Sequence, residues 1–171
     1  AEKNRVQGLP GDRRIGIHVL GDYAGKNAIQ LSSLNRGSVR IPVPQGSYSP
    51  VRFLVTGGHG DTLVPLVLEY ADGTTEETGL PCDDWFDDVP EEGRVEDGGV
   101  VQPGVVPALD GMDRIYGGVF DDAGGPAIFE VVRVTSPGKR LETGVLDSGK
   151  GLYMQLPGAP TRFNLLAVAG I

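Results

Sequence analysis

Glycine and proline are so frequent along this chain that few long helices can form in it. The 171 residues include 27 glycines and 13 prolines, which lie between short apolar runs. Both residue types are common in turns and weaken helices, so the pattern favours short strands joined by turns. A chain of this length buries an adequate core without disulfides or metal ions. We therefore expect a single all-β domain that spans residues 1–171.

Seven segments have the length and apolar pattern of β-strands and are bounded by turn-forming residues. In one of them Pro42 cannot donate to a ladder, which predicts an edge strand with Val39, Ile41 and Val43 on one face. The last segment is apolar on both faces, which predicts a central strand. The seven segments are residues 15–20, 28–34, 39–43, 51–56, 64–70, 128–134 and 162–168.

The sequence VPLVLEYADGTTEETGL predicts a β-hairpin. Asp72-Gly73 is a pair that supplies the positive φ angles of a tight two-residue turn. Alternation along the first arm points Glu69 toward water, and most of the Thr/Glu residues of the second arm are expected to face water as well. The opposite, buried face is expected to hold Val64, Leu66, Leu68 and Tyr70.

A long stretch at about residues 81–111 has no strand or helix period. Loops of this length inside a compact domain are usually functional or pack over one end of the fold. The stretch begins within LPCDDWFDDVPEE, where six acidic side chains surround the only tryptophan, Trp85, and the only cysteine, Cys82. We expect one long acidic loop excursion here.

Trp85 has two interpretations that the sequence leaves open. Its ring can stack on the apolar face of a sugar while neighbouring carboxylates accept hydroxyl hydrogen bonds. Alternatively, it is a core plug that fixes the start of the long loop, with its indole N–H bonded to a loop carbonyl.

The charge of the chain excludes some partners. The formal net charge is −8, and nearly all of the excess falls between residues 83 and 97, which hold eight acidic residues and one arginine. Nucleic acids and anionic membranes are therefore not expected as partners. No stretch approaches the roughly 20 apolar residues that span a bilayer, so we expect a soluble chain. A lone Cys82 predicts a packed free thiol.

Several motifs together resemble the galactose-binding-like jelly-roll domains, including carbohydrate-binding modules and accessory domains of glycoside hydrolases. They are NRVQGLPGDRRIG, GKNAIQL, PVRFLVTGGHGD, VPLVLEYADGTTEE followed by DDW, and TRFNLLAVAG, which together cover most of the chain. The resemblance implies a two-sheet antiparallel β-sandwich of the jelly-roll type. It also implies a structural calcium ion and a polysaccharide or oligosaccharide bound on the concave face or at the loop tips.

From this resemblance we expect a non-catalytic module of a secreted polysaccharide-processing protein, extracellular or periplasmic, and part of a larger multidomain chain. Two other functions stay open. One is a small carbohydrate-active hydrolase or lyase that uses Asp, Glu and His at the loop end. The other is a structural domain that binds a partner protein through the long loop. The sequence shows no catalytic constellation, which favours the non-catalytic module.

The acidic cluster offers candidate metal ligands. Calcium takes six to eight oxygen ligands, which neighbouring carboxylates can supply. The spacing differs from the alternating pattern of an EF-hand, so a solvated acidic loop is the competing interpretation. The candidate ligands are Asp83, Asp84, Asp87 and Asp88.

The remaining candidate ligand-binding residues are a histidine pair and three arginines. The chain has only two histidines, His18 in a predicted strand and His59 in TGGHGDT. His59 and Asp61 can act as a general base or hold a sugar hydroxyl, although such a tip is often only a turn. Arginine forks suit sugar hydroxyls and uronate carboxylates, with surface salt bridges to the acidic loop as the alternative. The arginines are Arg52 and Arg133, expected to point away from the apolar face, and Arg114.

Overall fold

The structure is a computed structural model that describes residues 5–7, 17–20, 24–34, 37–85, 105–109, 114–116, 119–122, 127–147, 149–150, 152–153 and 160–170. Within these residues all regular structure is β, and every pair of strands is antiparallel. The strands are β1 (Arg5–Gln7), β2 (Ile17–Val19), β3 (Ile29–Ser32), β4 (Ser38–Gly46), β5 (Val51–Gly58), β6 (Thr62–Tyr70), β7 (Thr75–Cys82), β8 (Val105–Leu109), β9 (Arg114–Tyr116), β10 (Val119–Asp122), β11 (Ile128–Arg133), β12 (Leu141–Asp147), β13 (Leu152–Tyr153) and β14 (Arg162–Gly170).

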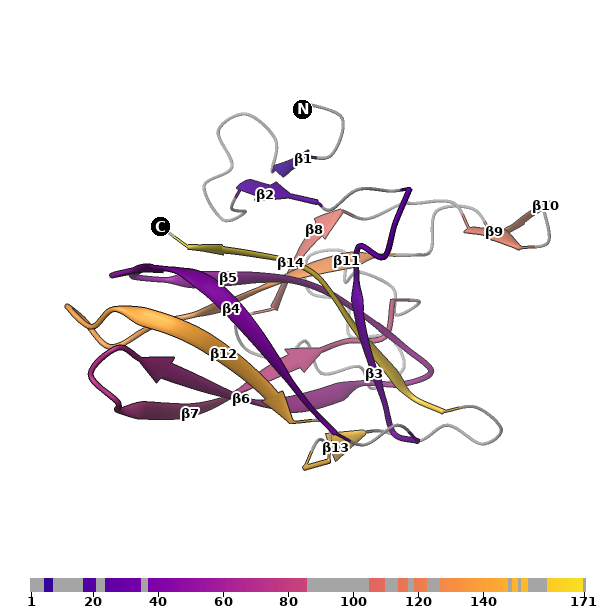
Figure 1. Ribbon diagram of the computed structural model, residues 1–171. Helices are drawn as coiled ribbons and strands as arrows, with labels where there is room; N and C mark the ends of the chain where they lie inside the picture. Colours follow the sequence, from indigo (N-terminus) through magenta and orange to yellow (C-terminus); the bar gives the residue numbers. More distant parts are fainter. Residues whose placement is uncertain are drawn as a thin grey trace, which may run out of the picture.

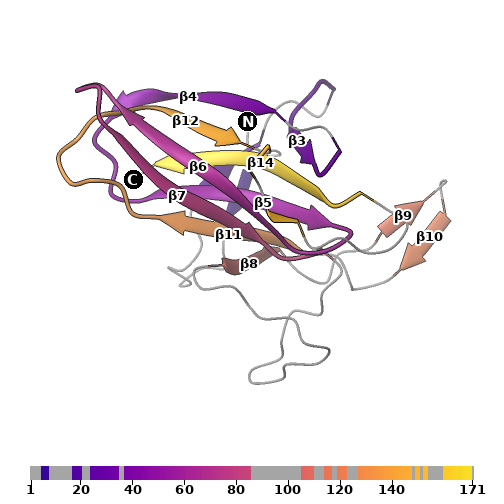
Figure 2. The same cartoon turned by 90° about the horizontal axis from the view of Figure 1, so that it is seen from below.

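Two sheets pack face to face and confirm the predicted β-sandwich. The first has the order β3-β14-β5-β11-β8. In the second, β6 pairs with β7 along one side and with β12 and the short β13 along the other, and β12 pairs with β4. Figure 1 shows the sheets as two layers, and Figure 2 shows the second sheet from below. The ribbon β1-β2 lies above the first sheet in Figure 1, on the side away from the second.

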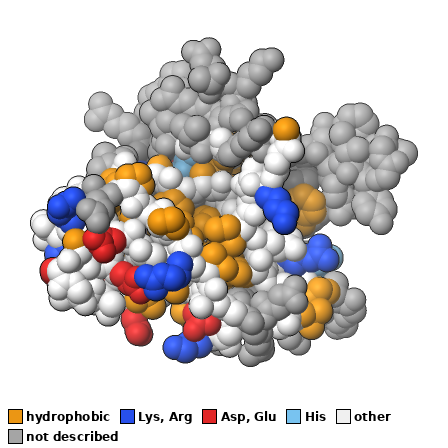
Figure 3. Space-filling model, in the orientation of Figure 1, with side chains coloured by type: hydrophobic (Ala, Val, Ile, Leu, Met, Phe, Trp, Pro, Cys, Tyr) orange, Lys and Arg blue, Asp and Glu red, His pale blue; other side chains and the backbone are white. Residues whose placement is uncertain are grey.

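The core lies between the sheets because the strands alternate. On β5, the side chains of Val51, Phe53 and Val55 are buried in the core, while Arg52 points to the outer face of the first sheet. Buried residues of the second sheet complete the core, and hydrophobic side chains are visible between β4 and β3 in Figure 3. The face predicted for the hairpin arm is confirmed, since these four side chains are at most 3% exposed: Val64, Leu66, Leu68 and Tyr70.

The predicted hairpin is confirmed, but its turn differs from the prediction. Gly73 donates to the carbonyl of Tyr70 at 2.9 Å, and Tyr70 donates to the carbonyl of Thr74 at 3.0 Å, which leaves a three-residue loop. Only Gly73 of this loop has a positive φ, at 79°. Asp72 keeps a negative φ because its carboxylate accepts hydrogen bonds from Thr74, from the N–H at 3.0 Å and from the hydroxyl at 2.5 Å.

All seven predicted strands are present, and two predictions of strand position are confirmed. The strand β4 lies at an edge with Pro42 in it, and β14 pairs on both sides, with β3 and β5. The predicted loop of residues 81–111 differs from the structure at both ends, since β7 continues to Cys82 and β8 forms an edge strand. Residues 86–104 lie outside the described residues.

Candidate functional site

The segment after β7 crosses the end of β5 and is fixed there by backbone contacts. Asp84 forms a parallel bridge with Gly57, and the Trp85 N–H donates to the Gly57 carbonyl at 3.3 Å. The Trp85 carbonyl accepts from the Ala127 N–H at 2.8 Å. Trp85 is therefore held between the end of β5 and the residue that precedes β11.

One glycine allows this crossing, and the next lies against the indole. A Cβ on Gly57 would lie 2.5 Å from the Asp83 carbonyl oxygen, so only glycine permits the close approach. A Cβ on Gly58 would lie 3.8 Å from Nε1 of Trp85, so the indole sits against this residue. Gly58 faces outward, opposite to the core residues Phe53 and Val55. The indole of Trp85, a half-buried residue, therefore lies on the outer face of the first sheet.

A row of polar side chains occupies the same face beside the indole. Strand pairing aligns Gly58 with Arg162, and the next outward positions along these strands are Thr56, Asn164 and Gln30. Gln30 donates from Nε2 to Oδ1 of Asn164 at 2.9 Å, and Asn164 donates from Nδ2 to the Thr56 carbonyl at 3.3 Å. Arg162 and Gln30 are exposed and the others are half-buried. We call these residues the Trp85 face: Trp85, Arg162, Asn164, Thr56 and Gln30.

The β5–β6 turn next to this face places His59 and Asp61 in different roles. His59 is exposed and has a φ of 62°, which is uncommon for a residue with a side chain. Its carbonyl accepts from the Thr161 hydroxyl at 2.9 Å, and its imidazole bonds to no described residue. Asp61 instead accepts from the Asp84 N–H at 3.0 Å, while the Asp84 carboxylate accepts from the Gly60 N–H. Asp61 and Asp84 thus clamp the crossing segment to the turn.

The solvated-loop interpretation is wrong for the first two acidic residues of the cluster. Asp83 and Asp84 are each only 8% exposed, because the crossing segment packs against the end of β5. Asp87 and Asp88 lie outside the described residues. Cys82 is a buried free thiol, as expected, and burial, followed by the charges of Asp83 and its neighbours, raises its pKa well above the usual value. This thiol is therefore protonated and unreactive at neutral pH.

Of the four candidate calcium ligands, Asp83 and Asp84 lie among the described residues, and Asp87 and Asp88 lie outside them. No three His, Cys, Asp or Glu side chains gather within them in a way that would hold an ion. The oxygens Oδ1 of Asp61 and Oδ2 of Asp84 are already hydrogen-bonded to backbone N–H groups. Calcium bound by the cluster would need the two acids outside the described part, Asp87 and Asp88.

Calcium binding has a direct thermal test. An ion that binds only the folded state stabilises it by about 2.7 kcal/mol at a hundredfold excess over its dissociation constant. If the structural calcium ion implied by the sequence resemblance binds at the acidic cluster, calcium-loaded protein should melt at a higher temperature than EDTA-treated protein, and Asp87→Asn with Asp88→Asn should remove this rise. Equal Tm values with and without calcium would contradict this expectation.

Two of the predicted arginines lie away from the Trp85 face in structural roles. Arg52 is only 14% exposed in its side chain and pairs with the buried Glu130 of β11, Nη1 to Oε1 at 2.5 Å. The prediction that Arg52 points away from the apolar face is confirmed. The predicted surface salt bridge is wrong, because the side chain is largely buried and pairs with the buried Glu130. Arg133 aligns with Val51 on the core side, contrary to the prediction, and donates from Nε to the Gly79 carbonyl of β7 at 2.6 Å. Burial lowers its pKa. The side chain of Arg114 lies outside the described part.

Glu130 also binds His18, so a buried polar triad lies beneath the ribbon β1-β2. Nε2 of His18 is 2.6 Å from Oε2 of Glu130, and both side chains are fully buried. Glu130 was not predicted as a site residue, because an isolated acid in a strand gives no local sign of a partner more than a hundred residues away. The triad joins the ribbon to the outer face of the first sheet.

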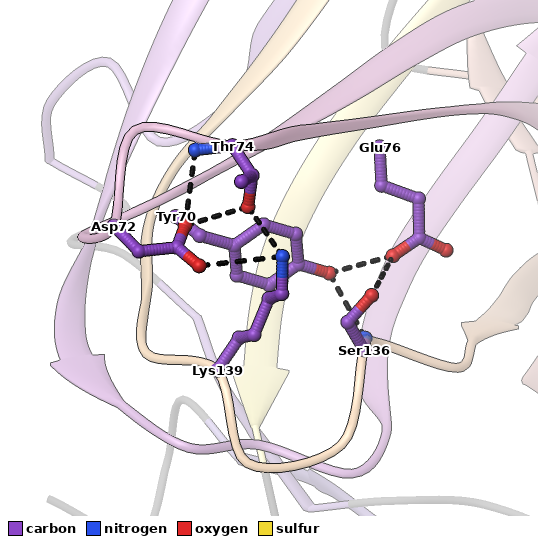
Figure 4. A network of polar contacts seen from close by, with 6 residues as sticks. All are labelled: Tyr70, Asp72, Thr74, Glu76, Ser136 and Lys139. Atoms are coloured by element: carbon purple, nitrogen blue, oxygen red, sulfur yellow. Dashed lines mark hydrogen bonds and ion pairs between the residues drawn. The ribbon is translucent and has the colours of Figure 1, made fainter.

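The opposite end of the sandwich has a polar network, drawn in Figure 4, with a structural role. Tyr70 donates to Glu76 at 2.7 Å, and Ser136 donates to Glu76 from its hydroxyl at 3.0 Å and to the Tyr70 oxygen from its N–H at 3.0 Å. Hydrogen bonds from the Thr74 side chain and backbone hold the pKa of Asp72 at about 2. Lys139 bonds to Thr74 at 2.6 Å and joins the β11–β12 turn to the hairpin.

Most residues of the Trp85 face were not predicted from the sequence either. In TRFNLL the core side chains Phe163 and Leu165 alternate with Arg162 and Asn164, so the outward polar positions are visible in the sequence. The prediction of a strand that is apolar on both faces passed over this alternation. Gln30 gives no local signal, because strand pairing brings it to Asn164.

Comparison with protein families and with curated proteins found no match, so a proposal of function rests on this geometry and on the sequence. No family model matches the chain, and no curated protein matches it. Among the described residues, no helix has the length and apolar character needed to cross a membrane.

Proposed function

We propose that this protein is a non-catalytic carbohydrate-binding module of the galactose-binding-like kind, which holds a glycan on the Trp85 face. One observation carries the proposal: the indole of Trp85 lies on the same sheet face as a hydrogen-bonded row of amide side chains. A flat aromatic ring beside several polar groups matches a sugar, which has an apolar ring face and hydroxyls around its rim.

The rigidity of the indole supports a binding role. Two backbone hydrogen bonds fix the backbone of Trp85, and its indole lies against Gly58. Trp85 is half-buried, so part of the residue is accessible. A platform fixed before binding loses little conformational entropy when a ligand stacks on it.

The side-chain amides of the Trp85 face have donor and acceptor groups that bond to no other described residue. Gln30 and Asn164 each use one N–H within the row, and no other described residue bonds to the second N–H of either amide or to the carbonyl oxygen of Gln30. Because each amide is oriented by its neighbour, these groups are positioned for ligand hydroxyls. Strands, rather than loops, carry Gln30, Asn164 and Thr56.

The nearby carboxylates support binding rather than hydrolysis. A glycosidase needs one carboxylic acid and one carboxylate on either side of the scissile bond. Asp61 and Asp84 accept backbone hydrogen bonds that hold the crossing segment. Secretion and attachment to a larger polysaccharide-processing protein belong to the same proposal and rest on the resemblance of the sequence motifs.

Affinity electrophoresis in gels that contain plant, algal and bacterial polysaccharides tests the proposal. We expect retention by at least one polysaccharide, without sugar release, and a loss of about tenfold or more in affinity for Trp85→Ala and for Asn164→Ala. Each substitution removes part of the platform. Val134→Ala is the control, because Val134 is an exposed apolar residue just beyond the far end of β11.

Circular dichroism of each variant checks that the fold is retained. Retention that survives both Trp85→Ala and Asn164→Ala would place the glycan elsewhere on the molecule. Failure of every polysaccharide to retard the unaltered protein would overturn the proposed function.

A further inference from the structure

We infer that the glycan bound at the Trp85 face is acidic, with a carboxylate or sulfate group that pairs with Arg162. This inference rests on the proposed function and names the class of ligand for the same site. It follows from the position of Arg162, from the absence of a bonding partner for it among the described residues, and from the uncharged side chains of its strand neighbours.

Arg162 differs from other arginines of the described chain. Arg40 pairs with Glu69, Arg52 pairs with Glu130, and Arg133 bonds to the Gly79 carbonyl. The guanidinium of Arg162 is exposed and forms no hydrogen bond or ion pair with any described residue. Its five N–H donors are therefore free to bind a ligand.

The strand pairing places Arg162 within reach of a sugar on Trp85. Arg162 lies directly opposite Gly58, the residue against which the indole rests. Opposite residues on paired strands have Cβ atoms about 5 Å apart, and an extended arginine reaches beyond that distance. A sugar stacked on the indole can therefore place a ring substituent against the guanidinium. The planar fork of arginine suits the paired oxygens of a carboxylate or sulfate.

The neighbouring side chains make this part of the surface favourable for an anion despite the net charge of −8. Strand neighbours on the face are uncharged, namely Ser32, Gln30, Asn164 and Thr56. Asp61 and Asp84, in the adjoining turn and crossing segment, each accept a backbone N–H. The exposed imidazole of His59 adds a second group that can donate to an anion.

The test uses three glycans that differ in charge: polygalacturonate, a sulfated galactan and a neutral galactan. Affinity electrophoresis and calorimetry measure binding to the unaltered protein and to Arg162→Gln, Arg162→Lys and Arg40→Gln. Arg40→Gln removes the same charge from an exposed position on the second sheet. We expect an acidic glycan to bind at least tenfold more tightly than the neutral galactan. Arg162→Gln should remove that preference, Arg162→Lys should retain part of it, and Arg40→Gln should leave it unchanged.

The outcomes separate the inference from the proposed function. Binding of polygalacturonate but not of its methyl ester assigns a carboxylate, and binding of the sulfated galactan alone assigns a sulfate. Equal binding of neutral and acidic glycans, or a preference that Arg162→Gln does not change, would overturn the inference and leave glycan binding in place. Absence of binding to all glycans would overturn both.

Discussion

Glu130→Gln is expected to lower the free energy of unfolding by about 3–5 kcal/mol, as removal of one partner from a buried ion pair does. Glu130 is fully buried between Arg52 and His18. Without that negative charge, the largely buried guanidinium of Arg52 loses the carboxylate with which it pairs. Urea unfolding followed by circular dichroism measures the change.

The exposed pair Arg40–Glu69 provides the matched control. The side chains of this pair are 62% and 30% exposed, so Glu69→Gln should cost less than about 1 kcal/mol. The double variant Glu130→Leu with Arg52→Leu should recover much of the loss, because apolar replacement of a buried pair is often neutral. If Glu130→Gln costs no more than Glu69→Gln, the triad is not a buried ionic contact.

The triad also explains why the first sheet has a buried outer face near β2. Leu54 faces outward on β5, between the outward-facing Arg52 and Thr56, yet it is fully buried. His18 of β2 reaches Glu130 on the same face, so the ribbon covers this part of the sheet. The Trp85 face lies toward the other end of the same strands, where Gly58 and Arg162 pair. One sheet face therefore combines a covered part with a polar part that includes exposed residues.

Strands with a strong local pattern could be predicted from the sequence, and strands with a mixed pattern could not. The arm from Val64 to Tyr70 alternates regularly, and the turn residue Gly73 marks the end of the hairpin. By contrast, β12 has the sequence LETGVLD, in which the buried positions are Leu141, Gly144 and Leu146. This spacing breaks the period of two at the irregularity in its pairing between Leu141 and Thr143.

The strand β8 was missed for a different reason. Pro107 within VVPAL argues against a strand in the middle of a sheet, and the surrounding sequence is rich in glycine and acidic residues. The strand lies at the sheet edge, where proline is tolerated because one side needs no ladder partner.

Some residues of the candidate site could be selected from the sequence by their type, but their contacts could not be predicted. Trp85 and His59 were selected for their residue types, and the structure brings them to the same end of β5 through the crossing at Gly57 and Gly58. The roles of Arg52 and Arg133 depend on strand pairing with β11 and on contact with β7. Such pairings join residues distant in the sequence, so local patterns give the direction of a side chain but not its partner.

The crossing itself predicts that two adjacent glycines respond very differently to the same added methyl group. Gly57→Ala would place Cβ 2.5 Å from the Asp83 carbonyl oxygen, a backbone atom that can move only with the whole crossing segment. Overpacking of this kind typically costs about 1–3 kcal/mol, and occasionally more. Neither glycine has a positive φ, so the cost arises from close approach and not from backbone conformation.

Gly58→Ala is the matched variant, because its Cβ would meet the indole at 3.8 Å, an ordinary contact distance. We expect it to change stability by less than about 1 kcal/mol. Urea unfolding measures both variants, and tryptophan fluorescence reports the environment of Trp85. Displacement of the crossing segment in Gly57→Ala should shift the emission to longer wavelength and remove polysaccharide retention, whereas Gly58→Ala should keep both properties. If Gly57→Ala were as stable as the unaltered protein, with unchanged emission, Asp83 would not cross Gly57 at this distance, and the position assigned to the indole on the outer face would be wrong.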